Sequence, residues 1–263
     1  MKIGIIGTGA IGKFVHDYAV ADGHEILAVL VRSDRLRNAG VSLQGIHCVD
    51  AVQDLPDGMD CMIDCAGHSA LRDHGAEILS RGIDLITVSL GALADQALFE
   101  SLQQAAVDGE SRLQLASGAI GALDCLLAAR VGKIRGVTYT GRKPPNSWRG
   151  SPAETRLDLD SLTAGAATHF QGTARTAAAE YPKNANVAAA VALAGIGFDN
   201  TDVELIADAD ITENIHEVAA SGDFGSFRFE IRGQSLPDNP KSSALAAMSV
   251  VSILQDKSLR IGF

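Results

Sequence analysis

The first thirteen residues, MKIGIIGTGAIGK, place a glycine-rich turn between a short apolar segment and a helix-compatible one. A G-x-G-x-x-G hexamer in this context predicts dinucleotide binding. The first glycine permits a tight turn, the second lets the backbone approach a pyrophosphate, and the third lets the helix pack closely on the strand. The start of the helix also offers N–H groups and the positive end of its dipole to phosphates. The alternative is a glycine turn with a purely structural role. The residues expected to bind the cofactor here are Gly7, Gly9, Ala10, Ile11 and Gly12.

The end of the next expected strand, His24 to Val31, bears on which dinucleotide is bound. In NAD-selective sites a carboxylate about 20 residues beyond the glycines accepts a hydrogen bond from the ribose 2′-hydroxyl. This chain instead has Arg32 and Ser33 there, with Asp34 just beyond. Because a guanidinium pairs well with a phosphate, we expect Arg32 and Ser33 at the ribose of NAD or NADP. The alternative is that Arg32 is an exposed surface cation.

Strand-like and helix-like segments alternate through the first half of the chain. Apolar strand patterns fall at 59–64, 83–89 and 112–116, with helical patterns at 71–81 and 94–109. This alternation predicts an α/β fold whose N-terminal part, residues 1–120, is a Rossmann domain with a doubly wound parallel sheet. Ligands of such sheets bind at the carboxyl ends of the strands. We therefore expect Cys65, Ala66 and Gly67 to line the cofactor cleft, while His68 is either near the cofactor or a polar turn residue.

From residue 133 onward the pattern changes to period-two alternation, which is typical of half-buried strands. Such segments fall at 134–142, 202–209, 214–220 and 224–233, with short helical segments between them. They predict a C-terminal α+β domain with a mixed or antiparallel sheet, residues 121–240. A final helix, 241–256, has an apolar face that we expect to pack back onto the first domain.

Candidate polar residues of the second half fall in three places. Arg142 and Lys143 precede a proline-rich loop, and Lys183 lies beside two asparagines, so all three are candidates to bind carboxylates, or else exposed basic residues. Asn186 is either a helix cap or a contact to an amide, a carboxylate or a nicotinamide. His216 lies in the middle of a strand, where the pattern alone favours a structural histidine.

Composition excludes several other classes of protein. A net charge of −10 and a pI near 5.1 argue against a nucleic-acid partner. No apolar run reaches about 18 residues, so no membrane span is expected, and the N-terminus does not have the pattern of a signal peptide. The four cysteines form neither a disulfide framework nor a C-x-x-C pair, and H-E-x-x-H is absent. We therefore expect a cytoplasmic protein with reduced thiols and no metal site.

Seven motifs along the chain together resemble those of the L-aspartate dehydrogenase family, which shares a two-domain architecture with dihydrodipicolinate-reductase-like enzymes. The resemblance covers essentially the full length, and all but the first motif are specific in this order. The motifs are GTGAIG (7–12), DCAGHSAL (64–71), SGAIGALD (117–124), RKPPNSW (142–148), YPKNANVAA (181–189), NIHEV (214–218) and NPKSSALAAMS (239–249).

The resemblance implies oxidative deamination of L-aspartate to iminoaspartate, and then to oxaloacetate and ammonia, with NAD or NADP. It implies that His216 is the catalytic residue and that Ala119, Ile120 and Asn186 lie on the nicotinamide side of the cofactor. It further implies a homodimer built on the sheet of the second domain, and a role in supplying iminoaspartate for NAD biosynthesis. Two alternatives remain: another reductase of the dihydrodipicolinate-reductase-like type, or a dinucleotide-binding sensor without turnover.

Overall fold

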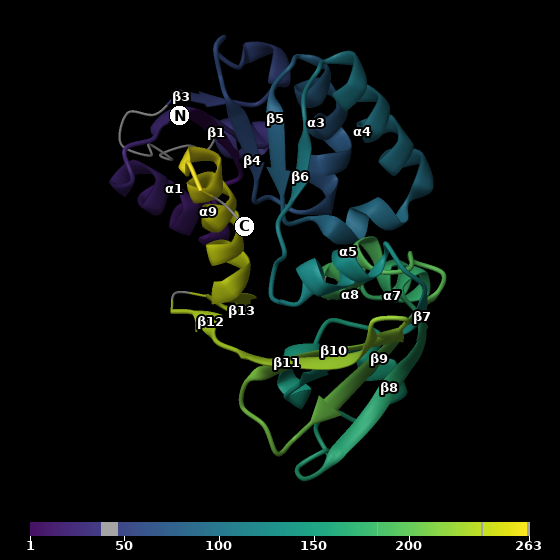
Figure 1. The fold of residues 1–263 in the computed structure, drawn as a ribbon. Helices are drawn as coiled ribbons and strands as arrows, with labels where there is room; N and C mark the ends of the chain where they lie inside the picture. Colours follow the sequence, from purple (N-terminus) through teal and green to yellow (C-terminus); the bar gives the residue numbers. More distant parts are fainter. Residues whose placement is uncertain (38–46, 183, 238, 262–263) are drawn as a thin grey trace. The chain divides into compact units, whose positions relative to one another are not determined.

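The structure is a computed structural model that describes residues 1–37, 47–182, 184–237 and 239–261 (Figure 1). The chain divides into two compact units, one made of Met1–Ala116 with Ala246–Phe263 and the other of Ser117–Leu245. The sequence prediction placed the division after residue 120. The predicted fold class, a Rossmann domain followed by an α+β domain with a mixed sheet, is confirmed. Within the described ranges, no helix has the length and apolarity needed to cross a bilayer.

The first unit is built on a parallel sheet of six strands in the order β3-β2-β1-β4-β5-β6. The chain winds from β1 toward one edge and then returns to add β4 on the other side of β1, so the strand order reverses between these two strands. Ligands of doubly wound sheets bind at such a reversal, outside the carboxyl ends of the strands. The strands are β1 (Lys2–Ile6), β2 (Glu25–Leu30), β3 (His47–Val49), β4 (Cys61–Asp64), β5 (Asp84–Thr87) and β6 (Leu113–Leu115).

Helices cover both faces of this sheet, with α1 and α9 on one face and α3 and α4 on the other (Figure 1). From α9, Val250 and Leu254 pack in one buried cluster with Ile3 of β1 and Val15 of α1. On the other face, a Cβ added at Gly75 would lie 2.7 Å from the Leu102 side chain, so this glycine lets α3 and α4 pack closely. The helices are α1 (Ala10–Ala21), α2 (Ser33–Arg37), α3 (His68–Ser80), α4 (Gln96–Asp108) and α9 (Ala244–Ser258), with 3-10 turns η1 (Val52–Asp54) and η2 (Leu90–Ala94).

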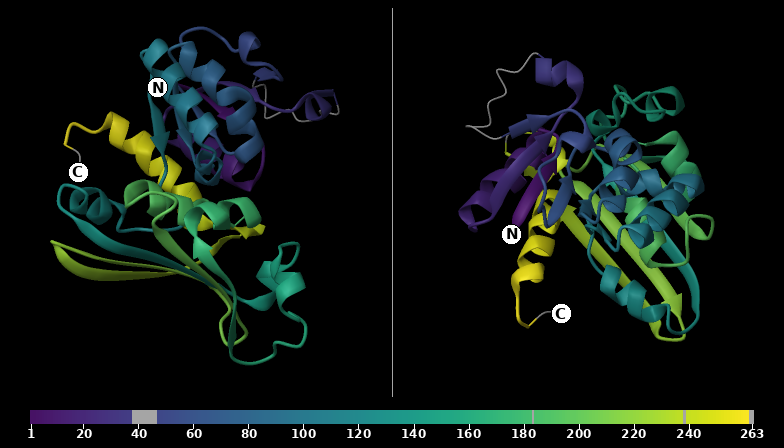
Figure 2. Two further views of the ribbon diagram at one scale, coloured as in Figure 1. Left: turned by 90° about the vertical axis from the view of Figure 1, so that its right-hand side faces the viewer. Right: turned by 90° about the horizontal axis from the view of Figure 1, so that it is seen from above.

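The second unit is a five-stranded mixed sheet in the order β11-β10-β7-β9-β8, in which only β7 and β9 pair in parallel. The helices α5, α7 and α8 lie on one face of it (Figure 2). Its strands are β7 (Ile134–Lys143), β8 (Ala166–Thr173), β9 (Thr201–Asp208), β10 (Asn214–Gly222) and β11 (Gly225–Gly233). Its helical elements are α5 (Leu123–Ala129), η3 (Pro145–Trp148), α6 (Ala153–Arg156), α7 (Ala174–Glu180) and α8 (Asn186–Ala194).

Alternation along β7 decides which side chains face the helices. Val137, Tyr139 and Gly141 are buried, whereas Thr138 between them is exposed. Successive strand residues point to opposite faces, so Tyr139 and Lys143 share the helix-covered face, and Arg142 lies on the other. Beyond the sheet, β12 (Ser235–Leu236) pairs with β13 (Asn239–Ser243). The expectation that the last helix begins at residue 241 is therefore wrong: β13 occupies that stretch, and the helix begins at Ala244.

Candidate functional site

The glycine turn of the first unit has the geometry that the hexamer predicts. Gly7 has a φ of +91°, which favours glycine, and a Cβ there would lie 2.8 Å from the Cβ of Ala66. A Cβ at Gly12 would collide with the carbonyl oxygen of Gly7. In contrast, no atom of the described residues, apart from those of Thr8 and Ala10 beside it, lies within 4 Å of a Cβ built at Gly9. Gly7 and Gly12 are therefore required by the fold itself, whereas Gly9 leaves space open at the start of α1.

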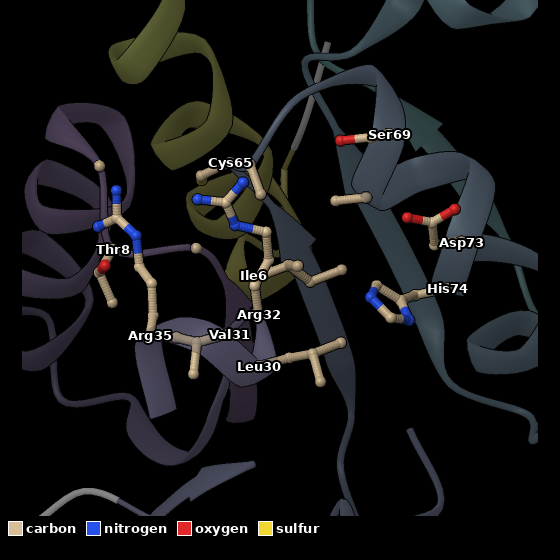
Figure 3. Close-up of a pocket in the computed structure, with 14 residues that line it drawn as sticks. Ile6, Thr8, Leu30, Val31, Arg32, Arg35, Cys65, Ser69, Asp73 and His74 are labelled. Carbon is tan, nitrogen blue, oxygen red and sulfur yellow. The ribbon is translucent and has the colours of Figure 1, made fainter. Parts of the chain in front are cut away.

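This open space continues into a cavity of about 310 Å³ at the carboxyl ends of the central strands (Figure 3). Thr8 and Gly9 border it from the glycine turn, and Cys65 and Ala66 border it from the end of β4. Ala10, Ile11 and Gly12 form the first turn of α1, whose N–H groups have no acceptor within the helix. Gly67 precedes α3 with a φ of +98°. The residues present thus fit a dinucleotide, with the pyrophosphate at the start of α1.

The outer part of the cavity is lined by two arginines and, opposite them, by α3 (Figure 3). Arg32 follows β2, and its guanidinium lies 3.5 Å from the Asp34 carboxylate while its side chain is 74% exposed. Arg35 lines the same cavity from α2, and Ser33 is the first residue of that helix. Sequence reasoning missed Arg35, which α2 places one turn beyond Arg32: its N–H donates to the Arg32 carbonyl oxygen. A 2′-phosphate would therefore meet two cations.

A buried carboxylate stabilises the loop after β4 that borders the cavity. Asp64, at the end of β4, is fully buried and accepts hydrogen bonds from Thr87 Oγ1 at 2.7 Å and from the Ala66 N–H at 2.9 Å. Burial raises the pKa of Asp64, and these donors oppose that rise by favouring the charged form. Asp64 thereby fixes the loop at Cys65–Ala66 against β5.

In the second unit, His216 of β10 is buried on the helix-covered face and bonded to a tyrosine. Its Nδ1 lies 2.7 Å from the Tyr139 hydroxyl oxygen, and the two rings are nearly parallel, at 18°. Burial, with a smaller effect of the Lys143 charge, lowers the pKa of His216 to about 3, so the imidazole is neutral. Burial raises the pKa of the Tyr139 phenol, which therefore keeps its proton.

Lys143, at the end of β7, supplies a cation on the same face of the sheet. Its Nζ donates to Asn184 Oδ1 at 2.9 Å and lies 4.9 Å from the centre of the Trp148 ring. Burial lowers its pKa to about 8. Among the residues that the structure describes, no carboxylate pairs with this ammonium group. Arg142, in contrast, pairs with Asp208 at 2.8 Å on the opposite face of the sheet, so the structure does not bring it together with His216.

The remaining residues expected at the nicotinamide or the substrate lie in a turn, at the start of a helix or outside the described residues. Ala119 and Ile120 are buried in the turn before α5. Asn186 is the first residue of α8, after Ala185 at the N-cap position, so neither asparagine caps this helix through its side chain. Lys183 lies outside the described residues. Across the described ranges, no group of three or more histidine, cysteine or acidic side chains could hold a metal ion.

The sheet order, the glycine turn and the cavity at the strand reversal define the first unit as a dinucleotide-binding domain. Comparison with protein families agrees: residues 3–116 match the NAD-binding domain of homoserine dehydrogenase, and residues 124–257 match the C-terminal domain of aspartate dehydrogenase. The L-aspartate dehydrogenase of Ruegeria pomeroyi is 52% identical over 99% of this chain and 94% of its own length. That of Pseudomonas aeruginosa is 46% identical over 97% of this chain and 96% of its own.

A solved structure extends the agreement to the whole fold. The crystal structure of aspartate dehydrogenase from Thermotoga maritima superposes with a TM-score of 0.79, at 27% identity, covering 100% of this chain and 99% of that one. The chain belongs to the aspartate dehydrogenase family. It is an oxidoreductase that uses NAD or NADP. Neither alternative, a reductase of another type or a sensor without turnover, is favoured by these matches.

Proposed function

We propose that this protein catalyses the NAD(P)-dependent oxidative deamination of L-aspartate, giving iminoaspartate and then oxaloacetate and ammonia. The observation that carries the proposal is the likeness to an L-aspartate dehydrogenase at 52% identity along 99% of the chain. The site adds support, because a neutral histidine and a cation that pairs with no carboxylate of the described residues suit an anionic amino-acid substrate.

In this proposal the first unit binds the cofactor, which accepts a hydride from the α-carbon of the substrate. The turn at Gly7 and Gly9 and the first turn of α1 (Ala10, Ile11, Gly12) bind its phosphates. Arg32 and Ser33 face its ribose. Cys65, Ala66 and Gly67 border the bound dinucleotide, and Ala119, Ile120 and Asn186 contact its nicotinamide side. Arg32 supports the use of NADP as well as NAD, because no carboxylate stands in its place.

The second unit binds the substrate and moves protons. His216 serves as the acid/base residue through Nε2, since Nδ1 is engaged by Tyr139. Lys143 attracts one substrate carboxylate, because it is a half-buried ammonium group held by a neutral amide rather than by an acid. Lys183 remains a second candidate. Arg142 does not bind the substrate in this proposal, since the Asp208 carboxylate already neutralises its charge.

The test is the formation of NAD(P)H with L-aspartate, measured against D-aspartate, L-glutamate, L-alanine and L-homoserine. We expect the highest kcat/KM with L-aspartate; a higher value with any other of these substrates would refute the proposal. His216→Ala should lower kcat by about 100-fold or more, the scale of acid/base catalysis, with little change in cofactor affinity. His47→Ala, at an exposed position of β3, is the control and should keep wild-type turnover.

We also propose that the protein is a cytoplasmic homodimer that supplies iminoaspartate for NAD biosynthesis. Four free cysteine thiols support the cytoplasmic location. The dimer is supported by two surface hollows on the face of the second unit's sheet opposite its helices, which are lined by Thr138, Ile206 and Ala219 among others. Ala219→Arg should yield a monomer in analytical ultracentrifugation. An unchanged sedimentation coefficient would exclude this face as the interface.

A further inference from the structure

His216 has two ring nitrogens, and its chemistry depends on which one carries the proton. In a neutral imidazole one nitrogen donates a hydrogen bond and the other accepts one. The hydrogen bond made by one nitrogen fixes the state of the other. Nδ1 lies 2.7 Å from the Tyr139 hydroxyl, while Nε2 makes no hydrogen bond to any residue that the structure describes. The direction of the Tyr139–His216 bond therefore decides whether Nε2 meets the substrate as a donor or as an acceptor.

The surroundings of Tyr139 favour one direction. Its hydroxyl is buried, and within the described ranges its hydrogen-bond partner is His216 alone. If Nδ1 carried the proton, the phenolic proton would be left buried without an acceptor, which is unfavourable. If the phenol donates to Nδ1, the phenolic proton has an acceptor, and the imidazole proton resides on Nε2. A phenolate could accept from Nδ1, but burial raises the pKa of Tyr139 and keeps it protonated.

Strand register places the phenol where it can do this. His216 pairs with Gly141 across the β7–β10 ladder, and Val218 pairs with Tyr139. The Tyr139 side chain thus reaches along the ladder to the next pair on the same face. A Cβ added at Gly141 would lie 2.7 Å from the Tyr139 hydroxyl oxygen and 3.1 Å from the Leu205 side chain. Gly141 therefore leaves the space that the hydroxyl occupies beside the imidazole.

We propose that Tyr139, in the space left by Gly141, is a positioning residue that holds His216 as the Nε2-protonated tautomer, so that His216 first acts as a proton donor. The inference rests on the proposed function. When the carbinolamine formed from iminoaspartate and water collapses, Nε2 gives its proton to the departing nitrogen as the C–N bond breaks, and Nδ1 takes the phenolic proton of Tyr139 in the same step, so that the imidazole stays neutral. The carbinolamine hydroxyl then returns a proton to Nε2 as the carbonyl forms, and Nδ1 returns its proton to Tyr139. The products are oxaloacetate and ammonia, and the neutral imidazole is regenerated.

The direct test is a long-range proton–nitrogen correlation spectrum of the full-length protein labelled with ¹⁵N-histidine, recorded without substrate. The chain has seven histidines, and the signals lost in His216→Gln identify His216. We expect a protonated, pyrrole-type Nε2 and an unprotonated, hydrogen-bonded Nδ1. A protonated Nδ1 would overturn the proposal. Because no substrate is present, failure of aspartate turnover would count against the proposed function and leave this result standing.

Variants supply a second, kinetic test. Tyr139→Phe keeps the ring and removes the hydroxyl, so the Nδ1 signal should shift. kcat should fall about tenfold while the KM for aspartate changes less than twofold, the size of effect expected for one lost hydrogen bond. Gly141→Ala should produce the same spectral shift by displacing the hydroxyl. Gly136→Ala, in the same strand but with no atom closer than 3.9 Å to the added Cβ, is the matched control and should resemble wild type. Wild-type kcat in Tyr139→Phe would contradict the proposal.

Substitution of His216 itself separates donation from proton acceptance. A glutamine side chain offers an N–H donor near the position of Nε2 but cannot take up a proton at neutral pH. His216→Gln should therefore retain about tenfold more activity than His216→Ala. Equal loss of activity in the two variants would show that Nε2 acts first as a base, and would refute the inference.

Discussion

Acidification from pH 7 to pH 5 should destabilise the second unit through two buried histidines, His169 and His216. Burial, assisted by the charges of Arg156 and Lys143, lowers the pKa of His169 to about 4. Burial lowers that of His216 to about 3. In the unfolded chain both return to about 6.5. Between these limits the unfolded state binds more protons, so the stabilisation is complete above about pH 6.5 and is lost as the pH falls.

The loss of stability follows from how far the pH lies below the pKa that the histidines have in the unfolded chain. Each pH unit below the unfolded pKa costs about 1.4 kcal/mol per histidine until the folded pKa is reached. At pH 5 the cost is about 2 kcal/mol for each histidine, or about 4 kcal/mol for both. Since folded domains are stable by only about 5–15 kcal/mol, this loss should be readily measurable.

The assay is urea unfolding at pH 7 and pH 5, followed by tryptophan fluorescence. Trp148 is the only tryptophan of the chain, is fully buried, and its ring centre lies 4.3 Å from that of His169, so the signal reports the unit that holds both histidines. His169→Gln and His216→Gln should each reduce the difference in unfolding free energy between the two pH values by about 2 kcal/mol. His47→Gln, on the surface of the first unit, is the control. A wild-type difference below about 0.5 kcal/mol would refute the reasoning.

Three further predictions concern the first unit. Gly9→Ala should leave the melting temperature unchanged but weaken NAD binding at least tenfold in a fluorescence titration. Gly12→Ala should lower both the melting temperature and the affinity for NAD, because of the two added Cβ atoms only the one at Gly12 collides with backbone. Equal melting temperatures of the two variants would contradict this. Arg32→Asp should raise the Kd for NADP more than that for NAD, and equal changes would remove Arg32 from the 2′-phosphate site. Thr87→Val removes one buried hydrogen-bond donor from the Asp64 carboxylate and should lower the free energy of unfolding by about 1–3 kcal/mol in chemical denaturation. An unchanged denaturation midpoint would show that this hydrogen bond does not stabilise the loop at Cys65–Ala66.

The parts of the site that are local in sequence could be predicted, and those that depend on strand register could not. The glycine turn is set by neighbouring residues, so the residues around Gly7 predicted its geometry. The partner of His216 is 77 positions away, and the two meet only through the pairing of β7 with β10. Period-two alternation could have placed Tyr139 and Gly141 on one face, but nothing in the sequence states which strand lies beside them.

Short elements without apolar periodicity were also missed. The segment SDRLR forms α2 and brings Arg35 to the cavity, yet it contains a single apolar residue and so gives no helical pattern. The strand β13 has the sequence NPKSS, which predicts a turn because asparagine and proline favour turns. In both cases tertiary contacts decide the structure.

The return of α9 to the first unit has a consequence for biosynthesis. Residues 117–245 form an insertion, so the core around Ile3 and Val15 lacks Val250 and Leu254 until the ribosome has passed residue 254. At about 5–20 residues per second, the first half of the chain waits roughly ten seconds on the ribosome with this apolar surface uncovered. The inserted unit is continuous and has no such delay. We expect it to fold first, so that the order of folding is the reverse of the order of synthesis, and the nascent N-terminal half to be the part that chaperones engage.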